Sequence, residues 1–205
     1  MLFTRVSLAL FWLIMTVLGL IVIKRRQSGD ISGFGGIPPS DVPRWGCVTI
    51  PLAILSFIYL SFLTILYVWT PNLVPDYIFY MFPLDTFILE TLESIGGGFT
   101  LLGAMIFLTA FFNLGSSIRL LLPKQNERTR LMTDGWYAHS RNPLYLGLHV
   151  SMMGWALIFP SLLVVVALVV FLANQHFRIL LEEDFLEEQF GDEYRDYKKQ
   201  VRRYL

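Results

Sequence analysis

The chain has 205 residues, of which 55% are hydrophobic and only 16% are charged, and its formal net charge is zero. This length suits one domain, and the low content of charged residues indicates an integral membrane protein instead of a soluble one. A zero net charge gives no general attraction to nucleic acid, so no nucleic-acid partner is expected. The single cysteine, Cys47, excludes an internal disulfide and a cysteine-based metal cluster.

Two apolar segments come first along the chain. The segment from Leu2 to Ile23 is long enough to cross a bilayer and has no cleavage motif of small residues, so we interpret it as a retained helix and not as a signal peptide. A loop rich in glycine and proline follows over residues 27–45. The second segment, Trp45 to Trp69, has aromatic residues at both ends, where interfacial rings settle. Prolines divide residues 70–94, which predicts an interfacial connector.

A third span is predicted from Ile95 to Leu122, because Pro123 ends the helix. It begins with Gly96-Gly97-Gly98, which we interpret as small residues for close helix packing, with contact between bare backbone and a ligand as the alternative. The next apolar run, Leu144 to Ala173, is longer than one span needs and has Pro160 near its middle. It forms either one kinked helix or a tight helical hairpin.

The distribution of charge favours the hairpin. Basic residues gather in residues 24–44 and 114–142, whereas residues 70–94 contain acidic residues and no basic ones. Positive loops stay in the cytoplasm, so the first three segments alternate across the membrane, starting from outside. The basic tail belongs inside as well, which requires an even number of crossings after residue 142. The sequence therefore predicts an all-α protein with five transmembrane helices, its N-terminus outside and its C-terminus in the cytoplasm.

The tail after Gly191 is predicted to form an amphipathic helix on the cytosolic membrane surface. Apolar and aromatic residues recur there at helical spacing, with Lys and Arg between them: Tyr194, Tyr197, Val201 and Tyr204. We expect residues 1–205 to form a single integral membrane domain. Residues 1–94 would supply two spans and the connector, and residues 95–205 the catalytic core.

Ionisable residues gather at the end of the last apolar run: Arg178, Glu182, Glu183 and Asp184. Such groups are costly beside a membrane span and are therefore candidates for function. Arg178 and Glu182 are four residues apart and share a helix face, so they form either an ion pair at the membrane rim or the lining of one polar pocket. The three histidines, His139, His149 and His176, show no metal-ligand spacing, so no metal site is predicted.

The C-terminal motifs, taken together, resemble one family. These motifs are Asp134-Gly-x-Tyr137, Arg141-Asn-Pro-x-Tyr145-x-Gly147, Arg178, Glu182-Glu183 and Phe190-Gly191-x-x-Tyr194-x-x-Tyr197. Their order and spacing are similar to those of the isoprenylcysteine carboxyl methyltransferase family, and more broadly of the membrane methyltransferases that include phospholipid N-methyltransferases. The family usually has His before Pro143. Here Asn142 can still form hydrogen bonds but cannot change its charge.

The resemblance implies S-adenosylmethionine as methyl donor, bound on the cytosolic side, and S-adenosylhomocysteine as product. Carried over by position, the cofactor contacts are Lys124, Gln125, Arg130, Leu131, Met132, Tyr137, Asn142, Pro143, Leu144, Tyr145 and Glu182. Arg178 is implied as the catalytic residue that holds the substrate. The expected reaction is methyl transfer to the carboxylate of a prenylated cysteine or a similar lipidic acid at the lipid bilayer. That acceptor is already ionised near neutral pH and needs no general base.

Two other functions stay open. A phospholipid-type N-methyltransferase is the second enzymatic hypothesis, although an amine acceptor would have to lose a proton and would be repelled by Arg178. A non-catalytic membrane scaffold or transporter subunit is the third hypothesis. Against it, the spans lack a ring of pore-lining charges, and the polar residues cluster at one rim.

Overall fold

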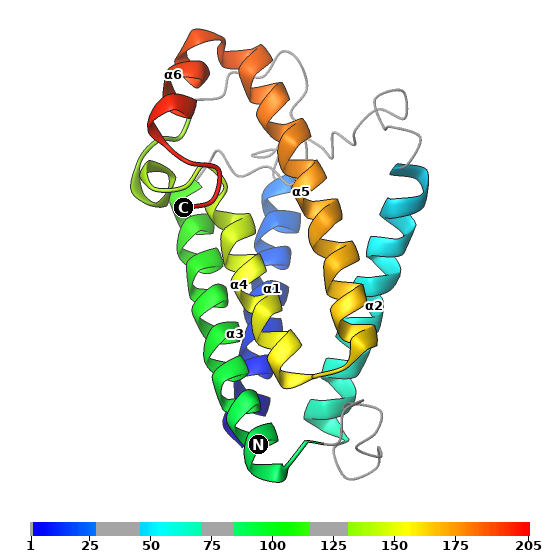
Figure 1. Cartoon of the computed structure of the whole chain (residues 1–205). Helices are drawn as coiled ribbons and strands as arrows, with labels where there is room; N and C mark the ends of the chain where they lie inside the picture. Colours follow the sequence, from blue (N-terminus) through cyan, green and yellow to red (C-terminus); the bar gives the residue numbers. More distant parts are fainter. Residues whose placement is uncertain (1, 28–45, 71–83, 115–130) are drawn as a thin grey trace.

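The computed structural model describes residues 2–27, 46–70, 84–114 and 131–205, and within these residues all regular secondary structure is helical. The bundle is built from α1 (Leu2–Gln27), α2 (Gly46–Trp69), α3 (Thr86–Leu114), α4 (Pro143–Ile158) and α5 (Leu162–Phe190). The short 3-10 helix η3 (Gly135–Ala138) and the helix α6 (Asp192–Gln200) lie at one end of this bundle (Figure 1). The predicted all-α class is confirmed.

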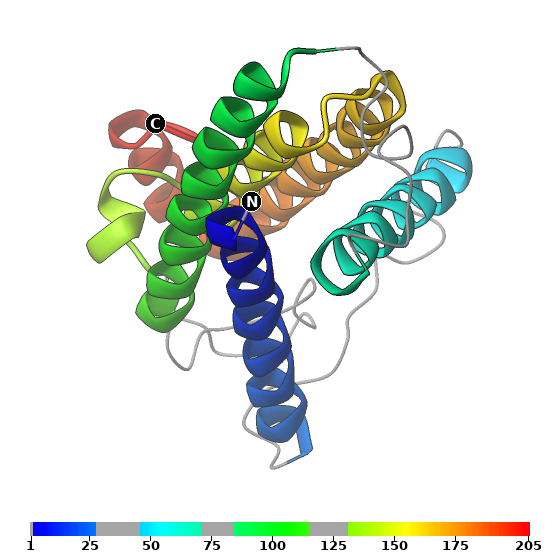
Figure 2. The ribbon, with the colours of Figure 1, turned by 90° about the horizontal axis from the view of Figure 1, so that it is seen from below.

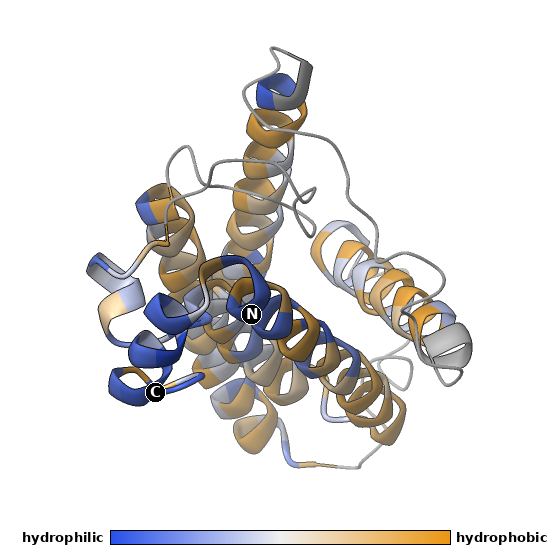
Figure 3. Cartoon of the chain, turned by 90° about the horizontal axis from the view of Figure 1, so that it is seen from above, coloured by the Kyte–Doolittle hydropathy of each residue, from blue (hydrophilic) through white to orange (hydrophobic). Residues whose placement is uncertain are grey.

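Four of the described helices are long and apolar enough to cross a membrane: Leu2–Arg25, Ile50–Trp69, Thr86–Leu114 and Leu162–Phe190. They identify an integral membrane protein, as the composition predicts. Helix α4 is shorter, and its 16 residues span about 24 Å at 1.5 Å per residue, less than the ~30 Å of bilayer hydrocarbon. Seen from above, hydrophilic residues gather over α6 and the adjoining end of α5, while the helices beneath are mostly hydrophobic (Figure 3).

Helix α3 differs from the prediction at its start. It begins at Thr86, whereas we expected a connector up to residue 94 and a helix from Ile95. The glycine run therefore lies inside a continuous helix and does not open it. Gly96 and Gly97 face neighbouring helices, while a Cβ on Gly98 would have nothing within 4 Å. Glycine is tolerated in a helix interior where close packing compensates for its conformational freedom.

Facing glycines bring α3 and α4 together, and this contact is the most extensive between any two helices of the described chain. A Cβ on Gly96 would lie 2.6 Å from the carbonyl oxygen of Gly154, so no side chain fits there. Gly103 of α3 faces Gly147 of α4 in the same way. The interpretation of Gly96 as a residue for close helix packing is confirmed.

The chain reverses its direction between α4 and α5. Helix α4 ends at Ile158, α5 begins at Leu162, and Pro160 lies in the turn between them. Proline lacks an N–H and has a fixed φ, so it stops the helical hydrogen-bond pattern. The two helices run in opposite directions, which brings residues 131–142 and the C-terminus to the same end of the bundle (Figure 1). The run from Leu144 to Ala173 is thus not one kinked helix.

One hydrophobic core joins the helices below that end. Trp155 of α4 is fully buried, and its ring lies 5.4 Å from that of Phe11 on α1. Leu60 of α2 and Val164 of α5 belong to the same cluster. Helix α5 packs mainly on α2, which lies at the edge of the bundle in the view from below (Figure 2). The core therefore holds α4 and α5 in place beneath the polar end.

The tail also differs from the prediction. Helix α6 ends at Gln200, so Tyr204 is not part of it. Tyr194 and Tyr197 are buried in a cluster with Leu131, and this aromatic face packs on the protein itself. The polar segment before α4 folds back onto α6 and covers this face, with the hydroxyl of Tyr197 bonded to the carbonyl oxygen of Tyr137. The position of α6 on a membrane surface stays a prediction.

Candidate functional site

Residues 131–142 are attached to α3 before they approach α5. Gly135 has a φ of +63°, in the left-handed region that favours glycine, and a Cβ at this position would collide with the Asn113 side chain. The indole Nε1 of Trp136 donates a hydrogen bond of 2.8 Å to the hydroxyl of Thr109. These contacts fix the turn that carries Tyr137 and Asn142 toward α5.

Three residues that the resemblance implicates meet between α4 and α5. The hydroxyl of Tyr145 donates a hydrogen bond of 2.6 Å to Oε1 of Glu182, and Nη2 of Arg178 lies 3.6 Å from the same oxygen. The side chains of Arg178 and Glu182 are 33% and 30% exposed. The expected ion pair therefore exists, and Tyr145 fixes one oxygen of its carboxylate.

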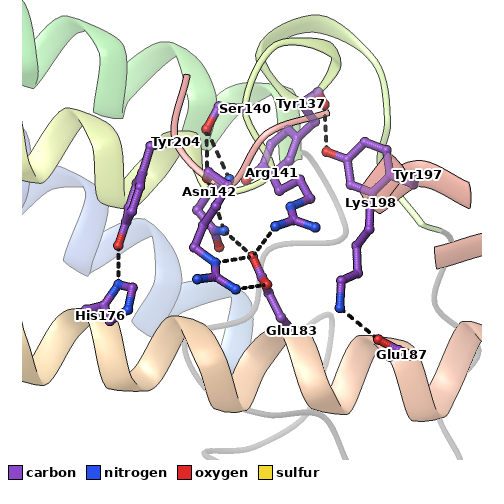
Figure 4. Close-up of polar contacts among 11 residues, drawn as sticks. Tyr137, Ser140, Arg141, Asn142, His176, Glu183, Glu187, Tyr197, Lys198 and Tyr204 are labelled. Carbon is purple, nitrogen blue, oxygen red and sulfur yellow. Dashed lines mark hydrogen bonds and ion pairs between the residues drawn. The ribbon is translucent and has the colours of Figure 1, made fainter. Parts of the chain in front are cut away.

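Glu183, next in the chain, is a buried carboxylate with several cationic and polar partners. Its exposed fraction is only 2%. It accepts hydrogen bonds from Nδ2 of Asn142 at 3.0 Å and from Nε and Nη2 of Arg203 at 3.1 and 2.9 Å (Figure 4). Nη2 of Arg141 lies 3.3 Å from the same carboxylate. A buried charge is costly unless it is paired and hydrogen-bonded, and these partners provide both.

The C-terminal segment, residues 201–205, runs across the loop that precedes α4. The N–H of Arg141 donates to the carbonyl oxygen of Arg202 at 2.9 Å. The carbonyl oxygen of Arg203 accepts hydrogen bonds from Ser140 Oγ and Asn142 Nδ2, each at 3.3 Å. The last residues of the chain are thus part of this polar end.

Tyr204 extends that contact to both long helices. Its hydroxyl lies 2.7 Å from Nδ1 of His176 on α5 (Figure 4). Its ring centroid lies 5.5 Å from that of His149 on α4. The C-terminal segment therefore bridges α4 and α5 next to the glutamates.

Tyr197 of α6 and Tyr137 of η3 stay neutral over a wide pH range. The hydroxyl of Tyr197 donates a buried hydrogen bond of 2.6 Å to the carbonyl oxygen of Tyr137. Burial raises the pKa of Tyr197 to about 12 and also raises the pKa of Tyr137 above its usual value. Tyr197 therefore remains a hydrogen-bond donor at neutral pH and keeps η3 attached to α6.

The structure brings together some of the residues that the resemblance names and not others. Those at the polar end between the 131–142 segment and α5 are Tyr137, Asn142, Pro143, Tyr145, Arg178 and Glu182. The side chains of Leu131 and Leu144 lie instead in apolar clusters, and Met132 is partly buried. Lys124, Gln125 and Arg130 lie outside the described residues. The role of all these residues as cofactor contacts stays a prediction.

The sequence did not predict the partners of Glu183. The sequence places Arg203 among the basic residues of the tail, and it places Arg141 both among the loop charges and in the family motif, without a partner for either. A sequence signal existed, because three acidic residues in a row, Glu182, Glu183 and Asp184, have only Arg178 one turn away as a cation. That imbalance predicts that further cations come from distant segments.

Known proteins resemble the part of the chain that carries Tyr145, Arg178 and both glutamates. Residues 92–193 match the phospholipid methyltransferase family. The chain belongs to this family. The matched range includes most of α3, all of α4 and α5, and hence Tyr145, Arg178 and both glutamates. The resemblance that the motifs indicated is confirmed.

Two relatives of this chain align with it over different lengths. A protein-S-isoprenylcysteine O-methyltransferase of Schizosaccharomyces pombe is 32% identical over 123 residues, which make up 58% of this chain and 51% of that protein. The chain thus spans about half the length of that relative. An uncharacterized protein of Haemophilus influenzae is 41% identical over 63 residues, which are 30% of this chain and all of that protein.

Proposed function

We propose that this chain transfers a methyl group from S-adenosylmethionine to the carboxylate of a prenylated cysteine or a similar lipidic acid, on the cytosolic side of a membrane. One observation carries the proposal. Tyr145, Arg178 and Glu182 place a guanidinium and an oriented carboxylate side by side, partly exposed, at the polar end of an apolar bundle. Membership of a methyltransferase family and the similarity to an isoprenylcysteine O-methyltransferase support it.

The chemistry of the residues present fits the methyl donor. S-adenosylmethionine has a cationic sulfonium, an amino-acid head, a ribose and an adenine, so it needs a carboxylate, hydrogen-bonding groups and an aromatic surface. Glu182 offers the carboxylate, Asn142 an amide, and Tyr137 and Tyr145 the aromatic rings. When bound, the donor supplies an electrophilic methyl group. We propose that these residues hold it, with Pro143 and Leu144 lining the same turn and Lys124, Gln125, Arg130, Leu131 and Met132 adding contacts from the preceding segment.

Arg178 is proposed to hold the acceptor. A guanidinium can form two parallel hydrogen bonds with a carboxylate and so orient the oxygen that attacks the methyl group. The acceptor is already ionised near neutral pH, so no side chain has to remove a proton. The rate enhancement would come from positioning and from exclusion of water. Apolar helix surfaces beside the site would admit the lipid tail.

The same site has a second candidate function, which the family description favours. Methyl transfer to the amine of a phospholipid agrees with a match to the phospholipid methyltransferase family. Arg178 argues against it, because a guanidinium repels an aminolipid headgroup and orients an anion better. The carboxylate acceptor is therefore the preferred proposal.

The proposed orientation in the membrane has five spans, with α4 and α5 crossing as a hairpin, the N-terminus outside and the C-terminus in the cytoplasm. The basic segments support it, and residues 95–205 would form the catalytic core on the inner side. Reporter fusions at Tyr80 and Glu127 should report opposite sides, and a fusion after Leu205 should match the one at Glu127. A C-terminal reporter on the outer side would contradict the hairpin.

The proposal is tested with purified protein in lipid nanodiscs. Calorimetry should detect binding of S-adenosylhomocysteine, and labelled donor should transfer its methyl group to a prenylcysteine faster than to an aminolipid. Faster transfer to the aminolipid would favour the second candidate. Absence of both binding and transfer would favour a non-catalytic scaffold or transporter subunit.

A further inference from the structure

We infer that Glu183 and Arg203 are positioning residues, which lock the side-chain amide of Asn142 so that it presents its carbonyl oxygen, and not its N–H groups, to the methyl donor. This inference rests on the proposed function, because it takes Asn142 to be part of the donor site. The C-terminal segment thereby becomes part of the donor site, and Oδ1 is the group that the Asn142 side chain offers.

The partners of Asn142 determine how its amide is turned. Nδ2 donates to Oε1 of Glu183 at 3.0 Å and to the carbonyl oxygen of Arg203 at 3.3 Å. A carboxylate and a backbone carbonyl can only accept hydrogen bonds, so the amide nitrogen has to face them. Both amide hydrogens are used inside the protein. The group that this side chain can offer to a ligand is therefore Oδ1, an acceptor.

The lock depends on the direction in which the Glu183 carboxylate is held. Arg203 binds both of its oxygens, through Nε at 3.1 Å and Nη2 at 2.9 Å. A bidentate pair of this kind adds geometric specificity to the charge attraction. Arg203 thus acts twice, since its guanidinium orients Glu183 and its carbonyl oxygen accepts from Asn142 directly. The hydroxyl of Ser140 also donates a hydrogen bond of 3.3 Å to the carbonyl oxygen of Arg203.

An acceptor at Asn142 suits the groups of a nucleoside that donate hydrogen bonds, which are the ribose hydroxyls and the amino group of adenine. A free amide could rotate by half a turn and offer N–H groups instead. Rotation here would place Oδ1 against the Glu183 carboxylate and the Arg203 carbonyl, which is a repulsive arrangement in a buried site. Asn142 itself is only 8% exposed, so water cannot replace the lost partners freely.

The neighbouring turn of α5 offers a matched control. Glu187 is also a carboxylate with two cationic partners, Arg195 at 3.0 Å and Lys198 at 2.8 Å. Its side chain is 32% exposed, and these partners belong to α6 and not to the loop that carries Asn142. Removing the charge of Glu187 therefore disturbs the contact between α5 and α6 without changing the hydrogen bonds of the Asn142 amide.

The test is a set of mutant cycles with two measurements, the affinity for S-adenosylhomocysteine by calorimetry and the midpoint of thermal unfolding. Asn142→Ala, Glu183→Gln and Arg203→Gln should each weaken binding about tenfold, the equivalent of one hydrogen bond of ~1.4 kcal/mol. In the Asn142→Ala background, Glu183→Gln and Arg203→Gln should cause no further loss of affinity while still lowering the unfolding midpoint. Glu187→Gln should leave the affinity unchanged.

Arg203→Lys sharpens the test, because it keeps the positive charge and loses the bidentate geometry, so partial recovery relative to Arg203→Gln is expected. If Glu183→Gln does not fold, the cycle of Arg203→Gln with Asn142→Ala is sufficient, because the Arg203 side chain is 33% exposed and Arg141 still pairs with the Glu183 carboxylate. The inference would be overturned, with the proposed function intact, if Glu183→Gln and Arg203→Gln lowered the affinity equally in the wild-type and Asn142→Ala backgrounds. An unchanged affinity in Arg203→Gln would have the same consequence. A wild-type protein that does not bind S-adenosylhomocysteine would overturn the proposed function and the inference with it.

Discussion

Replacement of Arg178 by alanine separates the two roles that its position allows. Arg178 lies 3.6 Å from Glu182, and both side chains are about a third exposed. An exposed pair four residues apart on a helix contributes only about 0.3–0.5 kcal/mol. Loss of the pair alone should therefore weaken donor binding no more than about twofold. Loss of a guanidinium that holds the acceptor should instead reduce kcat/KM about a hundredfold, or roughly 3 kcal/mol of transition-state stabilisation.

The assay measures both quantities on one preparation of Arg178→Ala: calorimetric affinity for S-adenosylhomocysteine and kcat/KM with a prenylcysteine acceptor. Arg195→Ala is the control, because Arg195 is also ion-paired but lies on the exposed side of α6. We expect nearly unchanged affinity and strongly reduced transfer in Arg178→Ala, with neither changed in the control. Wild-type kcat/KM in a folded Arg178→Ala protein would refute the acceptor role, and equal losses of affinity and transfer would reduce Arg178 to a partner of Glu182.

Three further predictions concern other contacts. Tyr145→Phe removes the 2.6 Å hydrogen bond to Glu182 and should weaken calorimetric binding of S-adenosylhomocysteine by about 1.5–3 kcal/mol, as expected for a bond to a charged group; unchanged affinity would contradict this. Gly154→Ala places a Cβ against the backbone of α3 and should lower thermal stability by about 1–3 kcal/mol, whereas Gly98→Ala, which meets nothing within 4 Å, should not. Burial raises the pKa of Tyr197 to about 12, so the contribution of Tyr197 to stability should be complete below about pH 10 and lost as pH rises through about 12. An alkaline titration monitored by circular dichroism should show this loss of stability. The loss should be smaller in Tyr197→Phe.

Hydropathy predicted the first two helices well, because length and apolar character decide whether a segment spans a membrane. The sequence placed Leu2 to Ile23 and Trp45 to Trp69 close to the observed α1 and α2. It placed the start of α3 too late, because three glycines in a row are typical of a helix end. The contact that keeps Gly96 inside the helix comes from Gly154, and a local pattern does not contain that distant partner.

In the site, too, the sequence predicted the local contacts and missed those between distant segments. Helical spacing predicted that Arg178 and Glu182 share a face of one helix. The family motifs named Tyr145 as a further residue of the site, and its hydroxyl bonds to Glu182. The pairing of Glu183 with Arg203 spans a helix end and a turn, and the basic tail was equally compatible with a membrane surface. Only the three-dimensional path of residues 201–205 across the loop shows that Arg203 neutralises a buried carboxylate.

The most direct test of the central claim is the chemical bond formed in the product. After incubation with labelled S-adenosylmethionine and a mixture of prenylcysteine and aminolipid in nanodiscs, the lipid fraction is treated with mild base. A methyl ester releases its label as volatile methanol, whereas a methylated amine retains it. We predict base-labile label on the prenylcysteine, strongly reduced in Arg178→Ala. Base-stable label on the aminolipid, unaffected by Arg178→Ala, would contradict a carboxyl methyltransferase.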